Sequence, residues 1–233
     1  GKKIAMKKGL KFTVVGPMND EVVLLQRDHD AFLKKKEKEK GTAGALASFT
    51  DTSVANLSSI VVLAEVGKKS ILFTGDARGD KILQGLELVG LLKPDGKSKM
   101  HVNILKGPHH GSNRNVERIF FNRITADHYV FSGNGEHGNP ERETLEMLLA
   151  ERGDENYTVH LTYPIDEIDV EREKDWKKEQ AKEKARKSKN VRPDWSAKKN
   201  SLAAFFAANK NFAKKVAIVD AKAPHLINLL DDI

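Results

Sequence analysis

Two apolar segments, each followed at once by a polar cluster that can bind metal, constrain this chain more than any other feature. The first segment ends at Gly75 and Asp76, and the second ends at His109 and His110. A carboxylate and imidazoles are the ligands that a hard or borderline divalent ion needs. We therefore expect the stretch 56–112 to place metal chemistry at the ends of two strands, with the rest of the chain supporting it.

The first apolar segment has the pattern of a β-hairpin. Residues 59–65 and 70–74 are nearly continuously apolar, and Gly67 opens the short polar turn between them. Strands without polar alternation are typically buried on both faces. The pattern therefore predicts two antiparallel strands in a sheet that other layers cover on both sides.

The rest of the chain alternates between strand and helix patterns. Strands are expected at 11–15, 102–105, 129–132, 157–163 and 216–219, and helices at 21–40, 80–92, 116–124, 140–152 and 201–209. The Gly- and Ser-rich segment 41–53 is expected to be a flexible connection. The alternation predicts an α/β fold with a mixed sheet and flanking helices.

The charge distribution divides the chain into two expected parts. We expect one domain over 1–165 and a charged helical extension, ending in a short strand or helix, over 166–233. The segment 171–192 has few apolar positions, which predicts a solvent-exposed helix or a disordered arm. Trp176 and Trp195 suggest that part of it docks on the domain. Its basic residues interleave with aromatic ones, which is compatible with nucleic-acid contact, although glutamates dilute the pattern.

Composition narrows the chemistry further. The 233-residue chain has no cysteine, so any metal must be bound by histidine and carboxylate side chains. The formal net charge of +7 favours acidic partners such as nucleic acid, whereas the alternative is that Lys-rich solvated helices create the excess. No apolar run approaches about 18 residues and the start is unlike a signal peptide, so we expect a cytoplasmic protein with no membrane partner.

Asp76 can be interpreted in two ways. A carboxylate that follows a glycine at the end of a buried strand can bind a metal, or it can cap the next helix. Because adjacent side chains at a strand end cannot easily face the same way, we expect one of His109 and His110 to bind the ion and the other to pack or to make a supporting hydrogen bond. Gly111 and Ser112 leave room for metal or substrate, which makes Ser112 a candidate substrate-binding residue.

A third polar element occupies the segment 132–140, a Gly-rich turn between a strand and a helix. It carries Asn134 and His137, which either border an active site as substrate-binding residues or serve only the turn. By contrast, the Asp-His-Asp triplet at 28–30 lies on an expected amphipathic helix. We therefore expect that triplet to be a surface feature.

The order of these motifs resembles the C-terminal half of metallo-β-lactamase-superfamily hydrolases. The most similar branch includes the hydrolase domain of bacterial DNA-uptake (competence) proteins. The resemblance covers about 54–150. It is carried by Asn56-Leu-Ser-Ser59, Thr74-Gly-Asp76-Ala, Leu105-Lys-Gly-Pro-His-His-Gly-Ser112, Phe131-Ser-Gly-Asn and Gly138-Asn-Pro140.

The resemblance implies an αββα sandwich with a two-metal site, usually zinc, at one sheet edge. It implies hydrolysis by a metal-activated water. Asp76 matches the carboxylate that bridges the two metals, and His109 or His110 matches a late histidine ligand. The expected function is thus metal-dependent hydrolysis of a phosphodiester or ester-type bond, with a nuclease included because of the positive charge.

The chain departs from the family in its ligand set. The family's main motif, His-x-His-x-Asp-His, occurs nowhere in the sequence. We expect either a hydrolase fragment completed by an N-terminal segment with that motif, or a non-catalytic scaffold or nucleic-acid-binding module that has lost most metal ligands. Half of a sandwich also leaves an apolar sheet face uncovered, so the expected partner is a missing N-terminal half or a second copy of the chain.

Overall fold

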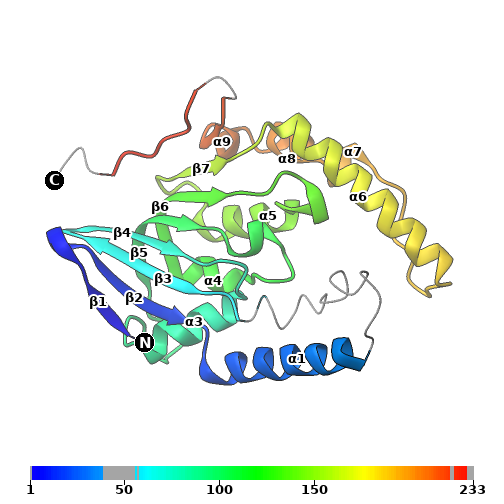
Figure 1. The fold of residues 1–233 in the computed structure, drawn as a ribbon. Coiled ribbons are helices and arrows are strands. Elements are labelled where there is room, and N and C mark those ends of the chain that lie inside the picture. Colours follow the sequence, from blue (N-terminus) through cyan, green and yellow to red (C-terminus); the bar gives the residue numbers. More distant parts are fainter. Residues whose placement is uncertain (1, 39–55, 57, 221–222, 230–233) are drawn as a thin grey trace.

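In the computed structural model, the described residues are 2–38, 56, 58–220 and 223–229 (Figure 1). The segment 41–53, expected to be a flexible connection, lies outside them. The strands are β1 (Lys3–Ala5), β2 (Lys11–Gly16), β3 (Val61–Val66), β4 (Lys69–Phe73), β5 (Met100–Lys106), β6 (Ile124–Phe131), β7 (Thr158–Leu161) and β8 (Val216–Ile218). The helices are α1 (Asn19–Lys38), α3 (Gly79–Leu88), α4 (Arg118–Arg123), α5 (Arg142–Arg152), α6 (Ile165–Ala185), α7 (Ala197–Asn200), α8 (Leu202–Ala208) and α9 (Lys210–Ala213), with 3-10 turns η1 (Lys7–Gly9), η3 (Pro108–Gly111) and η4 (Glu136–Gly138).

The eight strands form one sheet whose spatial order follows the chain, from β1 to β8. Neighbours from β1 to β4 are antiparallel, whereas neighbours from β4 to β8 are parallel. The predicted α/β class, with a mixed sheet and flanking helices, is confirmed. Strand β8, in the segment expected to be an extension, pairs with β7, while the proposed division at 165 stays a prediction.

Strands β3 and β4 form the predicted hairpin. Val66 pairs with Lys69, which leaves a two-residue turn, and Gly67 in that turn has a φ of +57°. This turn requires a residue with positive φ, which glycine adopts readily, so the glycine predicted to open the turn fits its geometry.

Helices α3, α4 and α5 pack on one face of the sheet, whereas α6 extends beyond its edge (Figure 1). Crossovers between parallel neighbours are right-handed, and strand order advances in one direction from β4 to β8. Each crossover therefore falls on the same side. The core on this side joins strand and helix residues, among them Leu72, Leu105, Tyr129, Val159, Leu86, Phe120, Leu145 and Phe205.

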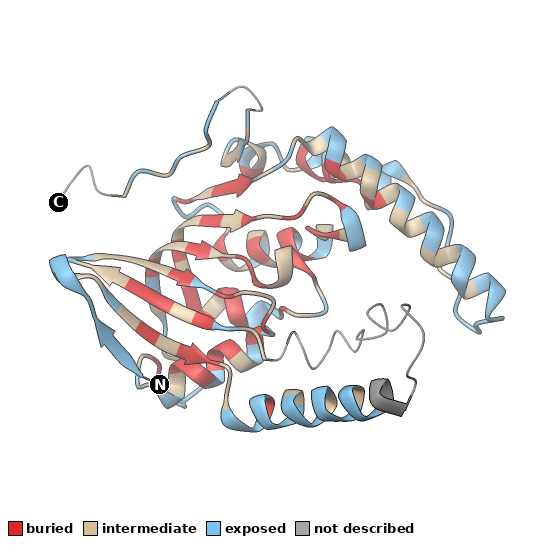
Figure 2. Ribbon diagram, viewed as in Figure 1, coloured by how far each residue is buried: buried red, intermediate tan, exposed pale blue. Residues whose placement is uncertain are grey.

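The opposite face of the sheet is less covered, and this corrects the sequence analysis. Phe73 of β4 is 47% exposed, and Val62 and Ile71 on the same face are partly exposed. Leu63 and Leu72 alternate with them and are buried on the helix side. The prediction that both hairpin strands are buried on both faces is therefore wrong (Figure 2). The strands are apolar on both faces, but within the described residues helices cover only one.

The segment 116–124, predicted to be one helix, divides between two elements. Helix α4 covers only 118–123, and Ile124 already begins β6, which starts five residues before the predicted strand. Phe120 and Phe121 are both buried, so apolar residues mark this stretch for the core without fixing its conformation. Packing of α4 against α5 and β6 decides where helix ends and strand begins.

Helix α6 settles the choice between a helix and a disordered arm over most of the charged segment. It contains eight acidic and six basic residues, and its buried residues are Ile168 and Arg172. Among the described residues, no helix has the length and apolar character needed to cross a membrane.

Candidate functional site

Asp76 and the histidine pair lie at the carboxyl ends of adjacent parallel strands. Strand β4 pairs with β5 through Ile71 and Ile104, so the loops after both strands leave the sheet at the same edge. The loops are joined by a hydrogen bond from His109 N to Gly75 O, 3.1 Å long. In parallel sheets, ligands bind outside the carboxyl ends of the strands. The structure thus brings together the two polar clusters found in the sequence.

The Asp76 carboxylate faces one imidazole and one ammonium group. Its Oδ1 lies 3.4 Å from His110 Nε2 and 3.7 Å from Lys106 Nζ. The Asp76 N–H points to Ser59 Oγ at 3.3 Å. Helix α3 begins after Arg78 and receives no side-chain cap from it. The contacts of Asp76 therefore match the metal-binding interpretation better than the helix cap.

The two histidines of the pair face different partners, as expected. His110 Nδ1 lies 3.0 Å from Ser132 Oγ, which leaves its Nε2 toward Asp76. His109 Nδ1 lies 3.3 Å from Asn56 Nδ2. Burial lowers the pKa of His109, with Asp76 opposing and nearby cationic groups adding to that shift. His110 is thus the histidine of the pair that faces Asp76, and Ser132 contacts the other side of its ring.

Three histidines of the site have left-handed backbone conformations. The φ angles are 44° at His109, 56° at His110 and 57° at His137. Residues with a Cβ rarely adopt this region, and such strain clusters at functional sites because surrounding structure enforces it. Gly111 follows the pair at φ 92°, where an added Cβ would meet Pro140 Cβ at 2.8 Å. This close packing fixes the histidine loop against the segment 132–140.

The segment 132–140 serves both the turn and the cleft. Glu136 N donates to Asn134 Oδ1 at 3.0 Å, and Gly135 N donates to Asn139 O at 2.8 Å. Asn134 thus stabilises the turn that carries His137. Both side chains also line the cleft, so the two alternatives left open by the sequence are not exclusive.

All six candidate residues line a single cleft of about 1100 Å³. They are Asp76, His109, His110, Ser112, Asn134 and His137. The same cleft is lined by seven carboxylate side chains and four arginines. The positive net charge of the chain therefore does not extend into the cleft, and this does not favour a polyanionic ligand there.

Helix α6 and the segment after it form the far wall of the cleft. Trp176 and Trp195 meet edge to face with ring centroids 5.8 Å apart, and both line the cleft. Arg192 stacks on Trp176 at 5.0 Å and pairs with Glu183 at 2.8 Å. These contacts join the two tryptophans to each other and to Arg192 within the same segment, so docking of the tryptophans on the rest of the chain stays a prediction. Lysines along α6 pair with its glutamates at 171, 173 and 179, so its basic face is largely neutralised.

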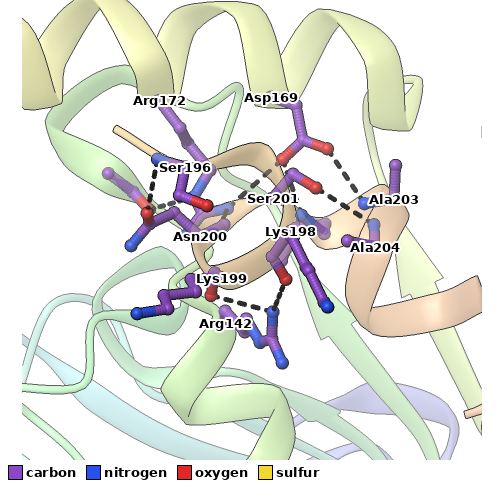
Figure 3. Close-up of polar contacts among 12 residues, drawn as sticks. Arg142, Asp169, Arg172, Ser196, Lys198, Lys199, Asn200, Ser201, Ala203 and Ala204 are labelled. Atoms are coloured by element: carbon purple, nitrogen blue, oxygen red, sulfur yellow. Dashed lines mark hydrogen bonds and ion pairs between the residues drawn. The ribbon is translucent and has the colours of Figure 1, made fainter. Parts of the chain in front are cut away.

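A polar network fixes α6 to the rest of the fold (Figure 3). Asp169 accepts hydrogen bonds from Leu202 N at 2.7 Å and Ala203 N at 2.9 Å, at the start of α8. Arg172 donates to Asn200 O at 2.7 Å and lies 3.2 Å from the Asp169 carboxylate. Because Arg172 also lines the cleft, this network sets the position of the cleft wall.

Sequence reasoning missed two further groups, one beside Asp76 and one in the cleft. Lys106 donates to Gly75 O at 2.7 Å, and burial lowers its pKa while Asp76 opposes that shift. A lysine inside an apolar strand was the available signal. Glu141 lines the cleft, and its Oε2 accepts from Asn113 N at 3.1 Å. Burial raises the pKa of Glu141, and no local pattern pointed to it.

The described residues do not make a complete metal centre. Asp76 and His110 are close enough to share one ion, but among the described residues no three His, Asp or Glu side chains converge where an ion could sit. The Asp-His-Asp triplet at 28–30 is no exception. A zinc ion needs about four ligands in fixed geometry, and the two neighbouring donors Asp76 and His110 do not meet that need by themselves.

No protein-family model matches the sequence, and a search of the curated proteins finds no match. The function of this chain is therefore argued from the residues of the cleft and their geometry.

Proposed function

We propose that this chain is part of a metal-dependent hydrolase of the metallo-β-lactamase type, acting on an ester-type or phosphodiester bond. The observation that carries the proposal is the approach of Asp76 Oδ1 to His110 Nε2, 3.4 Å, at the carboxyl ends of β4 and β5. The strained backbone of the histidine pair and the cleft in front of it support the same conclusion.

In this proposal each cleft residue has a distinct role. Asp76 and His110 are zinc ligands, and Ser132 orients the His110 ring through Nδ1. His109, with its lowered pKa, stays neutral near pH 7 and is the second candidate ligand. Ser112, Asn134 and His137 line the cleft beside them and contact the substrate.

The missing ligands come from a second sheet that packs on the open face. The open face carries Phe73, Val62 and Ile71, and the Asp76 loop follows β4 at its edge. Among the described residues the apolar face lacks a covering layer and the metal ligands are too few, and both deficits occur beside the same strand. We propose one occupant for both: an N-terminal half of the same fold, with an apolar inner face and its own histidine ligands.

Zinc titration of the chelator-treated chain tests this proposal. We expect weak binding that is lost in Asp76→Ala and in His110→Ala, because each variant removes one of two adjacent donors. His29→Gln, on exposed α1, is the matched control and should bind as the parent chain does. Two tightly held ions per isolated chain would contradict the incomplete centre. Zinc binding that is equal in all variants would remove Asp76 and His110 from the site.

One observation favours a non-catalytic module instead. Lys106 Nζ lies 3.7 Å from Asp76 Oδ1, so the carboxylate has a cationic neighbour without any metal. In that alternative the fold scaffolds a partner or binds nucleic acid. Absence of zinc binding at millimolar metal, together with no hydrolysis of nitrophenyl ester or phosphodiester substrates when the N-terminal half is supplied, would favour it. Salt-dependent binding to DNA or RNA would then identify the nucleic-acid form.

A further inference from the structure

Three histidines from separate parts of the chain form a row on the sheet face opposite the helices. His128 Nδ1 lies 3.0 Å from His160 Nε2, and His160 Nδ1 lies 2.8 Å from His225 Nε2. His128 belongs to β6 and His160 to β7. His225 belongs to residues 223–229, which follow β8 and are called the C-terminal strap below.

The strap accounts for the burial of the middle histidine. Val159 and Leu161 are fully buried in the core, so His160 between them projects to the opposite face of the sheet. It is nevertheless only 6% exposed. The rings of His128 and His225 lie against it, with centroids 5.1 Å and 5.0 Å away. The strap is thus attached to the sheet by a contact between imidazoles.

The contacts between the three rings fit neutral imidazoles, and protonation of the rings disfavours them. Each neutral ring has one donor and one acceptor nitrogen, so three rings can be joined by two hydrogen bonds in one direction. A proton added to the row places a cation on a half-buried or buried ring, and protons on two neighbouring rings place two cations on rings whose centroids lie only 5.1 Å or 5.0 Å apart. The docked row therefore holds fewer protons than three separated histidines would hold in acid.

We propose that this row is a pH-operated latch, which holds the C-terminal strap on the sheet at neutral pH and releases it as the pH falls below about 6.5. The latch does not depend on metal chemistry in the cleft. The two nitrogen-to-nitrogen contacts each join one pair of rings and do not converge on one point, in keeping with the absence of a three-ligand metal group among the described residues.

The direction of the pH effect follows from proton linkage. Burial, with His128 and His225 adding to it, lowers the pKa of His160 to about 4. Burial also lowers the pKa of His128. A released imidazole titrates near 6.5, so docking is fully favoured above about pH 6.5 and weakens as the pH falls toward 4. For one linked proton, the released-to-docked ratio rises about tenfold per pH unit, or about 30-fold at pH 5.0.

Other charged groups beside the row modify this effect without reversing it. Asp127 precedes His128 on β6 and raises its pKa, against the larger effect of burial. The Asp127 carboxylate is shared with His101 of β5, whose Nε2 lies 3.2 Å away. Strand β8, next to β7, carries no charged residue, and Asp220 lies between β8 and the strap.

Hydrogen exchange of the peptide containing the strap, measured by mass spectrometry from pH 7.5 to 5.0, tests the latch. Rates are corrected with an unstructured reference peptide. In the parent chain we expect protection of the strap to fall by about 30-fold over this range. His160→Gln retains a donor and an acceptor but cannot titrate, so its strap should show no pH dependence. His29→Gln, outside the row, should follow the parent chain.

The outcomes separate the latch from other attachments. The proposal is overturned if strap protection in the parent chain does not change with pH. It is also overturned if His160→Gln loses strap protection with falling pH as the parent chain does. If the strap of His160→Gln is unprotected at every pH, the imidazole of His160 is still the group that attaches the strap. Release by a chelator at pH 7.5 would show a metal link and refute the proton latch.

Discussion

Asp169 offers the sharpest test of how the cleft wall is held. Its carboxylate is 14% exposed, accepts two backbone N–H groups at the start of α8, and lies 3.2 Å from the guanidinium of Arg172. Asp169→Ala removes all three interactions at once. The Arg172 side chain is only 6% exposed, so the variant leaves a buried cation without its anionic partner.

The contacts of Asp169 set the expected change in the free energy of unfolding. Asp169 accepts two N–H groups at the start of α8, whose N-cap residue is Ser201, and loss of such a side-chain acceptor costs about 1 kcal/mol. Loss of one partner from a buried ion pair costs about 3–5 kcal/mol. These values describe one carboxylate and are not additive, and Arg172 keeps bonds to Gly138 O and Asn200 O. We therefore expect Asp169→Ala to lower the free energy of unfolding by about 3 kcal/mol, and Asp169→Asn, which keeps one acceptor oxygen, by about half as much.

Urea denaturation followed by far-UV circular dichroism measures this change. Glu171→Ala is the matched control on the same helix, since Glu171 pairs with Lys174 at exposed positions and should contribute less than about 1 kcal/mol. If the free energy of unfolding of Asp169→Ala lies within about 0.5 kcal/mol of the value for the parent chain, this network does not anchor α6. Equal losses in the two variants would also refute it.

Two further predictions concern the core. Gly85→Ala should lower stability by about 1–3 kcal/mol in thermal or urea unfolding, because its Cβ would meet Val15 O at 2.3 Å and push α3 from β2; an unchanged midpoint would contradict this. Burial raises the pKa of Tyr129 to about 12, whereas the unfolded side chain titrates near 10. Stability should therefore fall as the pH rises from 10 to 12. Tyr129→Phe should show a smaller loss of stability between pH 10 and 12. It should also lower the free energy of unfolding by about 1–3 kcal/mol at pH 7, since Ala126 N loses its acceptor. If the variant loses stability at high pH as the parent chain does, Tyr129 is not the source of that loss.

Much of the fold could be predicted because most of its elements are indicated by the residue pattern of their own segment. The hairpin at 61–73 follows from two apolar runs and a glycine turn, and the α/β class follows from the alternation of periods. The segment 116–124 was predicted to be one helix, and this was wrong because its apolar residues suit a helix or a strand equally. Its division was set by contacts with α5 and β6, which lie farther along the chain.

The cleft was predictable in part for a similar reason. Asp76 and His110 each follow a strand, and parallel strands bring such ends together. Lys106 and Glu141 were not predicted, since their place at the cleft depends on how neighbouring loops fold back. Trp176 and Trp195 were singled out from the sequence, but their place in the cleft was not predicted, since their contact joins residues 19 positions apart across a turn.

The sequence by itself determined the strands, most helices and the pairing of a carboxylate with histidines, because these depend on side-chain periodicity and on residues near one another in the chain. Only the tertiary structure decided which face of the sheet the described helices cover, because the strand order places the crossovers between parallel strands on the same side. It also decided which histidine faces Asp76 and brought His128, His160 and His225 into one row. These contacts join distant positions, and their geometry is fixed by packing rather than by local pattern.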